Sequence, residues 1–220
     1  MTGPALSNPS PSPTDRSRVR RTRERGFYDR ATILRILDCG LHCHVGFLAD
    51  GHPFVIPTMY WHDENHLYFH GSRASRMMRA AEGRSVCVTV THFDGLVLAR
   101  SAFHHSANYR SVSIFGTAEP IDEAGRAVQL EHLMERLFPG RWRQLRPVRR
   151  KELKATRVLR VALSEASAKI RTGPPIEDPK DSGWPAWAGV VAFQTIALPP
   201  QSDVHVKAGC AAPAFALPQG

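Results

Sequence analysis

Apolar and polar residues alternate with a period of two along several segments of this chain. Between residues 41 and 48, Cys43, Val45 and Phe47 fall on one face of an extended strand, and His42 and His44 fall on the other. Short strands at this spacing favour an antiparallel barrel or sandwich over βαβ units. We expect a mainly β fold, a barrel of six to seven antiparallel strands with inserted helices. The six to seven strands would be drawn from eight strand-like segments: 41–48, 54–61, 66–70, 85–91, 95–99, 109–118, 156–163 and 167–171.

Turn and cap signals separate these segments. Asp50-Gly51 predicts a tight hairpin turn. Pro57 has no N–H to donate, so the strand that contains it should lie at a sheet edge or a bulge. Asp29 and Asp122 are suited to cap two helices, and a third helix should follow the turn at 71–76.

The length of 220 residues and the hydrophobic content of 42% suit one domain with loose ends. We expect a disordered basic arm at 1–24, a folded domain at 25–198 and a flexible tail at 199–220. No apolar run approaches the roughly 20 residues that a membrane span needs, and the first residues lack the pattern of a secretory signal. We therefore expect a cytoplasmic protein with reduced cysteines.

The formal net charge of +9 raises the question of nucleic-acid binding. The excess of arginine and lysine lies in two stretches, 16–25 and 141–160. Basic clusters attract polyanions, but the chain carries no helix-turn-helix, zinc-finger or RNP signature. A nucleic-acid partner is not expected.

The segment Cys39–His44 has the residue types of a metal site. Its spacing lacks a second ligand pair, and on a strand His42 and His44 point away from Cys43. No metal is expected.

A basic turn at 71–76 is the most informative stretch for chemistry. It places Gly71, Ser72, Arg73, Ser75 and Arg76 between a strand and a helix. Helix N-termini and guanidinium groups both favour phosphate, and arginine there opposes the helix dipole unless an anion binds. The alternative is an ordinary capped helix with a solvated first turn.

A second polar stretch precedes a strand at residues 103–112. Asn108, Tyr109, Arg110 and Ser111 supply donors that could line the rim of a barrel. A polar loop with Tyr109 packed on the sheet edge would give the same pattern.

Taken in order, several motifs resemble the pyridoxamine-5′-phosphate-oxidase-like flavoproteins. The similarity is greatest to the branch that contains nitroimidazole-resistance and flavin-nucleotide-binding proteins, and it covers roughly residues 25–198. The motifs lie at 57–60, 67–72, 105–112, 152–156, 167–175 and 187–190.

The resemblance implies an FMN-binding split β-barrel whose homodimer interface forms two cofactor sites. Four groups of residues and Trp187 would then bind FMN, and they divide by the part of the cofactor that they contact. Val55, Ile56, Pro57 and Thr58 would lie along the isoalloxazine; His70, Gly71 and Ser72 would flank the ring and ribityl chain; Arg73, Ser75 and Arg76 would hold the phosphate; Asn108, Tyr109, Arg110 and Ser111 would contribute from the facing strand, and Trp187 would cover the flavin. Of these, His70 is the candidate acid–base residue because imidazole titrates near neutrality.

This resemblance predicts an FMN-dependent oxidoreductase of unknown small-molecule substrate, with NAD(P)H as a candidate reductant. The arginine and histidine motif that ends true pyridoxamine-phosphate oxidases is absent from 212–220, which speaks against oxidation of vitamin B6. Other hypotheses stay open: haem bound through His70, His104 or His105, deazaflavin binding, a non-catalytic flavin carrier or sensor, and a DNA-associated regulator.

Overall fold

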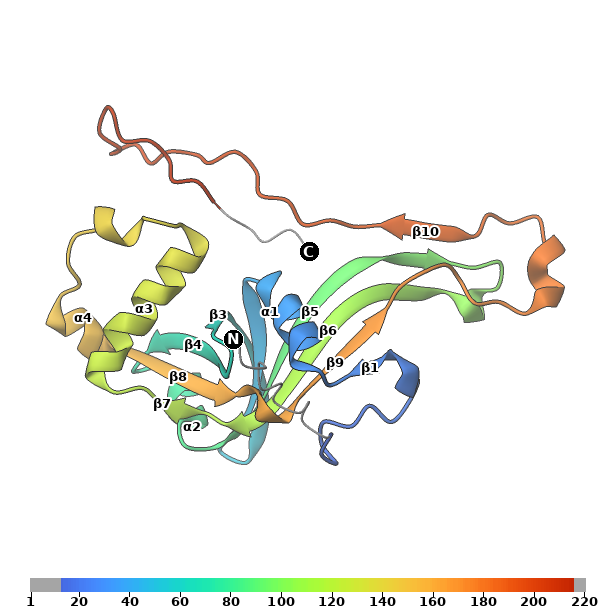
Figure 1. Cartoon of the computed structure of the whole chain (residues 1–220), viewed down its shortest axis with the longest axis horizontal. Helices are drawn as coiled ribbons and strands as arrows, with labels where there is room; N and C mark the ends of the chain where they lie inside the picture. The colour runs from blue at the N-terminus through green and yellow to red at the C-terminus, as the bar shows by residue number, and fades with distance from the viewer. Residues whose placement is uncertain (1–12, 216–220) are drawn as a thin grey trace, which may run out of the picture.

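A single curled antiparallel sheet forms the centre of the computed structural model, which describes residues 13–215. The order along the sheet is β1-β9-β6-β5-β2-β3-β4-β8-β7, and β10 pairs with β5 outside this path. The strands curve into an open half-barrel (Figure 1). Their bounds are β1 Gly26–Phe27, β2 His42–Ala49, β3 His52–His62, β4 His66–Ser72, β5 Ser85–Leu98, β6 Ser106–Thr117, β7 Glu119–Pro120, β8 Thr156–Ala162, β9 Ala166–Arg171 and β10 Gly189–Ala192.

The strand count differs from the six to seven that we expected, since the sheet has ten strands. Segments 85–91 and 95–99 form one strand, β5, whose register shifts at a bulge between Phe93 and Gly95. β1 and β7 have two residues each, which is too short for any periodicity to reveal. Their existence depends on pairing with β9 and β8. The mainly β class and the split-barrel architecture are confirmed.

Within residues 13–215, four α-helices and five short 3₁₀ turns accompany the strands. The Asp29 carboxylate accepts from the N–H of Thr32 at 2.8 Å and caps α1, and Asp122 caps α3 in the same way. Both caps were expected from the sequence. The bounds are α1 Arg30–Asp38, α2 Arg76–Ala81, α3 Glu123–Leu137 and α4 Arg150–Ala155, with 3₁₀ turns η1 Arg23–Arg25, η2 Ala102–His104, η3 Trp142–Gln144, η4 Leu163–Glu165 and η5 Pro179–Gly183.

The β2–β3 hairpin turns at Asp50-Gly51, as expected. Both residues have positive φ, 51° and 78°, which is the backbone of the type I′ turn that asparagine, aspartate and glycine favour. The hairpin fixes the register, so His44 lies opposite Pro57. Cys43 is buried while His42 and His44 are exposed, so the three side chains cannot bind one metal. Within residues 13–215 no group of three or more metal-binding side chains comes together.

The core has two parts, one on each face of the sheet. The larger lies inside the half-barrel, where α1 and α2 contribute Ile36 and Met78. The smaller lies between α3 and the outer face of β3, β4 and β8, around Trp61 and Leu133. Burial of such side chains gives roughly 1.5–3 kcal/mol each, so β3 and β4 are stabilised from both faces where they pair.

β5 and β6 extend well beyond the half-barrel as a long arm (Figure 1). β10 runs along β5 in this arm through the pairs Gly189–Leu98 to Ala192–Gly95. We call residues 193–215, which follow β10, the C-terminal strap. The strap returns from the arm across the molecule toward α3 (Figure 1).

Residues 13–24, expected to belong to a disordered arm, lie against the sheet in the described structure. Arg16 forms an ion pair with Glu165, and its guanidinium lies 5.6 Å from the centroid of the Phe115 ring. The preceding residues of that expected arm lie outside the described part. Among residues 13–215 no helix is long and apolar enough to span a membrane.

Candidate functional site

One edge of β3 is open along most of its length. β2 pairs with β3 from His52 to Met59, whereas β4 pairs with it only at Tyr60–His62. Val55 is 65% exposed there. Pro57 therefore lies on an edge, as its missing N–H required. The unpaired backbone groups of this edge can donate to and accept from a ligand.

The basic turn at residues 71–76 lies beside this open edge in space. Arg76, the first residue of α2, places its guanidinium 4.7 Å from the centroid of the Phe54 ring on β3. Arg73 and Arg76 are both exposed. The structure thus brings together the first and third groups of expected site residues, Val55–Thr58 with Arg73–Arg76.

Backbone hydrogen bonds fix the shape of this turn. The Arg73 N–H donates to the carbonyl of Ala155 at 2.8 Å, and the Ser75 N–H donates to the carbonyl of Ser72 at 2.9 Å. Ser75 is the N-cap of α2, yet its hydroxyl makes no capping hydrogen bond. Because α2 has only six residues, its dipole is weak and anion attraction would come from the two guanidiniums and the hydroxyl.

His70 and Gly71 face opposite sides of β4. The His70 ring lies 5.8 Å from Trp61 on the outer face, near α3. Its Nδ1 is buried and has no hydrogen-bond partner, and burial lowers the pKa of the ring. Gly71 faces α2, where a Cβ would come within 3.0 Å of Met78. We expected His70, Gly71 and Ser72 to flank the ring and ribityl chain of a flavin; His70 and Gly71 point to opposite faces of β4, because successive strand residues alternate.

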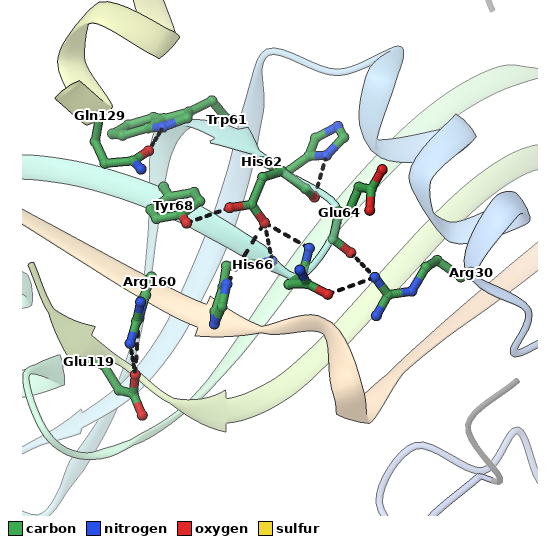
Figure 2. Close-up of polar contacts among 11 residues, drawn as sticks. Arg30, Trp61, His62, Glu64, His66, Tyr68, Glu119, Gln129 and Arg160 are labelled. Atoms are coloured by element: carbon green, nitrogen blue, oxygen red, sulfur yellow. Dashed lines mark hydrogen bonds and ion pairs between the residues drawn. The ribbon is translucent and has the colours of Figure 1, made fainter. Parts of the chain in front are cut away.

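A network of hydrogen bonds holds the β3–β4 turn beside these residues (Figure 2). The Asp63 carboxylate accepts from the Tyr68 hydroxyl at 2.6 Å and from the N–H groups of Asn65 and His66. Burial acts to raise the pKa of Asp63, but these hydrogen bonds outweigh it and the pKa is lowered. Trp61 stacks on Tyr68 with ring centroids 5.7 Å apart, and its indole donates to Gln129 of α3 at 2.9 Å (Figure 2). The network holds β4 in place.

The second polar group, Asn108–Ser111, lies on β6, and β5 and β2 separate it from β3. The Arg110 guanidinium binds both oxygens of Asp94, at 2.9 and 3.0 Å. The Ser111 hydroxyl donates to the carbonyl of Lys169 at 3.3 Å, and Tyr109 is half-buried. Within one chain these residues do not reach the open edge of β3.

Asn108 has a structural role that the sequence did not reveal. It is 8% exposed, and Arg171 donates to its side-chain oxygen and to the carbonyls of Gly173 and Pro174. The Asn108 amide donates to the same Gly173 carbonyl at 3.2 Å. These bonds fix the path of the chain after β9, and they leave Asn108 little capacity for a ligand.

Trp187 lies two residues before β10, the strand that pairs with β5 in the arm. It is 65% exposed, and its indole covers Gly189, where a Cβ would lie 2.7 Å from the ring. Like β6, this position is remote from β3 along the sheet. Because of this separation, Trp187 could cover a ligand at the β3 edge only if that edge belonged to a second copy of the chain.

A cavity of about 1050 Å³, not predicted from the sequence, lies under the C-terminal strap. Three segments far apart in the chain form it: residues 39–42, residues 91–94 and residues 192–197, with Phe215 and Arg110. The His92 Nε2–H donates to the carbonyl of Ile36 at 2.9 Å, and burial lowers the pKa of this histidine. The one sequence signal near this cavity was the run of two cysteines and two histidines at residues 39–44.

The fold and the open edge together define a split barrel. A family model described as pyridoxamine 5′-phosphate oxidase matches residues 29–170. The chain belongs to this family, as its motifs indicated. Among curated proteins none matches the chain.

Two solved structures resemble the chain over most of its length. The flavocytochrome Anf3 from Azotobacter vinelandii is 43% identical, with 92% of this chain and 95% of that chain covered and a TM-score of 0.88. The FAD and heme binding protein from Mycobacterium smegmatis is 35% identical, with 86% and 94% covered and a TM-score of 0.82. A protein from Bacteroides thetaiotaomicron described as a 5-nitroimidazole antibiotic resistance protein is 19% identical, covers 66% of this chain and 86% of its own, and has a TM-score of 0.54. This last likeness concerns the fold alone.

Proposed function

We propose that this protein is a flavin-dependent redox protein that also binds haem. The observation that carries the flavin assignment is the meeting of the open β3 edge with the basic turn, joined by the contact of Arg76 with Phe54. A flavin presents a polar ring edge and a phosphate, which are the two features that such a pair of surfaces can bind. The two relatives above 30% identity are described as a flavocytochrome and as an FAD and heme binding protein, and they support both cofactors.

In this proposal the chain binds the part of the cofactor that FMN and FAD share. Backbone groups of Val55–Thr58 bind the polar edge of the ring, and Arg73, Ser75 and Arg76 hold the first phosphate. The flavin supplies hydride and electron transfer, while the protein supplies orientation and hydrogen bonds. We expected FMN from the motifs, and the description of the second relative favours FAD.

We further propose that the protein works as a homodimer. Large apolar side chains are exposed along the arm, including Phe103, which is 90% exposed, and Trp184. Val55 and Met59 are exposed on β3. Exposed apolar surface of this kind marks association sites. A second copy would also bring β6 and Trp187 of one chain toward the β3 edge of the other, which a single chain does not do.

The spectrum of the purified protein tests the cofactors. Bound flavin absorbs near roughly 450 nm and haem near roughly 400 nm, and heat release followed by chromatography separates FAD from FMN. A protein that binds neither flavin when it is offered FMN or FAD contradicts the flavin assignment. A protein that binds flavin but takes up no haem when offered hemin contradicts the second cofactor alone.

Two further measurements test the assembly and the turnover. Sedimentation should give twice the chain mass of 24.5 kDa, and a monomer at micromolar concentration would contradict the dimer. Anaerobic NADH or NADPH should bleach the flavin band if the protein is an oxidoreductase with a nicotinamide donor. If neither does, while dithionite bleaches the band, a carrier role or another electron donor is favoured.

A further inference from the structure

The cavity under the C-terminal strap is separate from the flavin surface of the preceding proposal. Its walls come from the α1–β2 junction, the middle of β5 and the strap, whereas the flavin surface consists of the β3 edge and the basic turn. The strap is held over the cavity at both ends. The Phe193 N–H donates to the carbonyl of Asp94 at 3.0 Å, and the Phe215 ring lies 5.2 Å from that of Phe138 at the end of α3.

Aromatic side chains give the cavity the character of a site for a flat apolar molecule. Phe93 and Phe193 meet edge to face, with ring centroids 5.4 Å apart, and Phe215 lines the same space. The volume of about 1050 Å³ exceeds what a small metabolite needs. The one arginine in the lining, Arg110, already binds both oxygens of Asp94, so the cavity lacks a free guanidinium for a second flavin phosphate.

Three side chains in the lining could ligate iron, and two of them are already engaged. His92 uses Nε2 to donate to the Ile36 carbonyl, which leaves only Nδ1, the nitrogen crowded by its own Cβ. The Cys39 Sγ accepts from the Arg110 guanidinium at 3.6 Å, and its thiol donates to the Arg35 carbonyl at 3.1 Å. A thiolate, the form that binds haem iron, would lose this bond.

His42 remains. Within residues 13–215 its ring takes part in no hydrogen bond or ion pair, and its side chain is exposed in the cavity wall. Its backbone is rigid, because β2 is paired with β3 at Met59 and Cys43 is buried behind it. The ring stands edge-on to that of His44, with centroids 5.6 Å apart.

We propose that the strap-covered cavity is a haem site and that His42 is an axial ligand of the iron. This inference rests on the proposed function, since it places the second cofactor. It differs from the sequence-based candidates His70, His104 and His105. His70 lies against Trp61 and is not part of the cavity wall.

Removal of the ligand tests the assignment without any turnover assay. His42→Ala, loaded with hemin, should bind haem more than about tenfold more weakly than the parent, and its Soret band should shift or vanish. The flavin content should stay at the parent value. Added imidazole should restore the band, because it can enter the space left by the side chain and ligate the iron.

His44→Ala is the matched control, as His44 shares the strand and the exposed face but does not line the cavity. His70→Ala controls for the sequence-based alternative. Both variants should retain haem and the parent spectrum. A His42→Ala protein with parent haem affinity and spectrum overturns the assignment, and so does loss of haem from either control alone. A parent protein that binds flavin but no haem overturns the second cofactor and this site together.

Discussion

The guanidinium of Arg76 lies over the ring of Phe54, 4.7 Å from its centroid. This contact joins the start of α2 to the strand whose edge is open, across 21 intervening residues. A cation over an aromatic face contributes about 0.5–1 kcal/mol at an exposed site. It holds the charge of Arg76 beside the β3 edge before any ligand arrives.

Replacing Arg76 should weaken flavin binding. Arg76→Ala removes one charge-assisted contact to the phosphate, worth about 1.5–3 kcal/mol, which corresponds to a loss of roughly ten- to a hundredfold in affinity. Titration of flavin-free protein by fluorescence quenching measures it. Arg79→Ala is the control, since Arg79 is exposed on the same helix one turn further on. Equal affinities for the two variants would disprove the phosphate assignment.

The pair Arg110–Asp94 should stabilise the bulge of β5. Both side chains are roughly three-quarters buried and the contact is bidentate, so Asp94→Asn should lower the free energy of unfolding by about 1–2 kcal/mol. Chemical denaturation of both single variants and the double variant gives the coupling energy. Additive effects of Asp94→Asn and Arg110→Ala would show that the pair contributes nothing to stability.

Arg171 should matter for stability more than its place on a short strand suggests. It is 5% exposed and satisfies the Asn108 oxygen and two carbonyls. Arg171→Ala removes these hydrogen bonds and leaves the buried Asn108 oxygen without this donor, at a cost of about 1–3 kcal/mol. Lys169→Ala on the same strand should change stability by less than about 0.5 kcal/mol. Similar melting temperatures for the two variants would contradict this role.

Stability should fall as the solution becomes mildly acidic. Burial lowers the pKa values of His62, His70 and His92 below their ordinary value of 6.5. The unfolded chain therefore binds more protons than the folded chain once the pH drops below 6.5, so folding is favoured above that pH and weakened below it. The slope is at most about 1.4 kcal/mol per pH unit for each histidine.

Chemical denaturation at several pH values between 7.5 and about 5 measures this slope. Carboxylates titrate below this range and so contribute little to it. His70→Asn should reduce it, because the Nδ1 of His70 has no partner to compensate for burial. A parent protein whose unfolding free energy is constant across this window would show that these rings do not titrate as proposed.

Local signals in the sequence were reliable where a single residue sets the backbone. Asp50-Gly51 forms the expected turn, Asp29 and Asp122 cap the expected helices, and Pro57 lies at an edge. The alternation around Cys43 separates it from His42 and His44 as predicted. Each of these depends on the residue itself or on neighbours within four positions, so no tertiary contact is needed to decide them.

Site residues were harder to predict, because their roles depend on partners remote in the sequence. Arg110 and Asn108 looked like free donors, yet Asp94 and Arg171 engage them. Whether those two donors were free depended on the register of β6 with β5 and β9, which no local pattern encodes.

The sequence by itself determined the family, the mainly β class and the position of the open-edged strand, because motif order, period-two alternation and a proline without an N–H are properties of the chain alone. Only the tertiary structure decided that ten strands join one sheet, that Arg76 meets Phe54, and that the strap closes a cavity over His42. Those outcomes are pairings between segments tens to more than a hundred residues apart. Their free energy comes from surfaces that exist only once the sheet has folded.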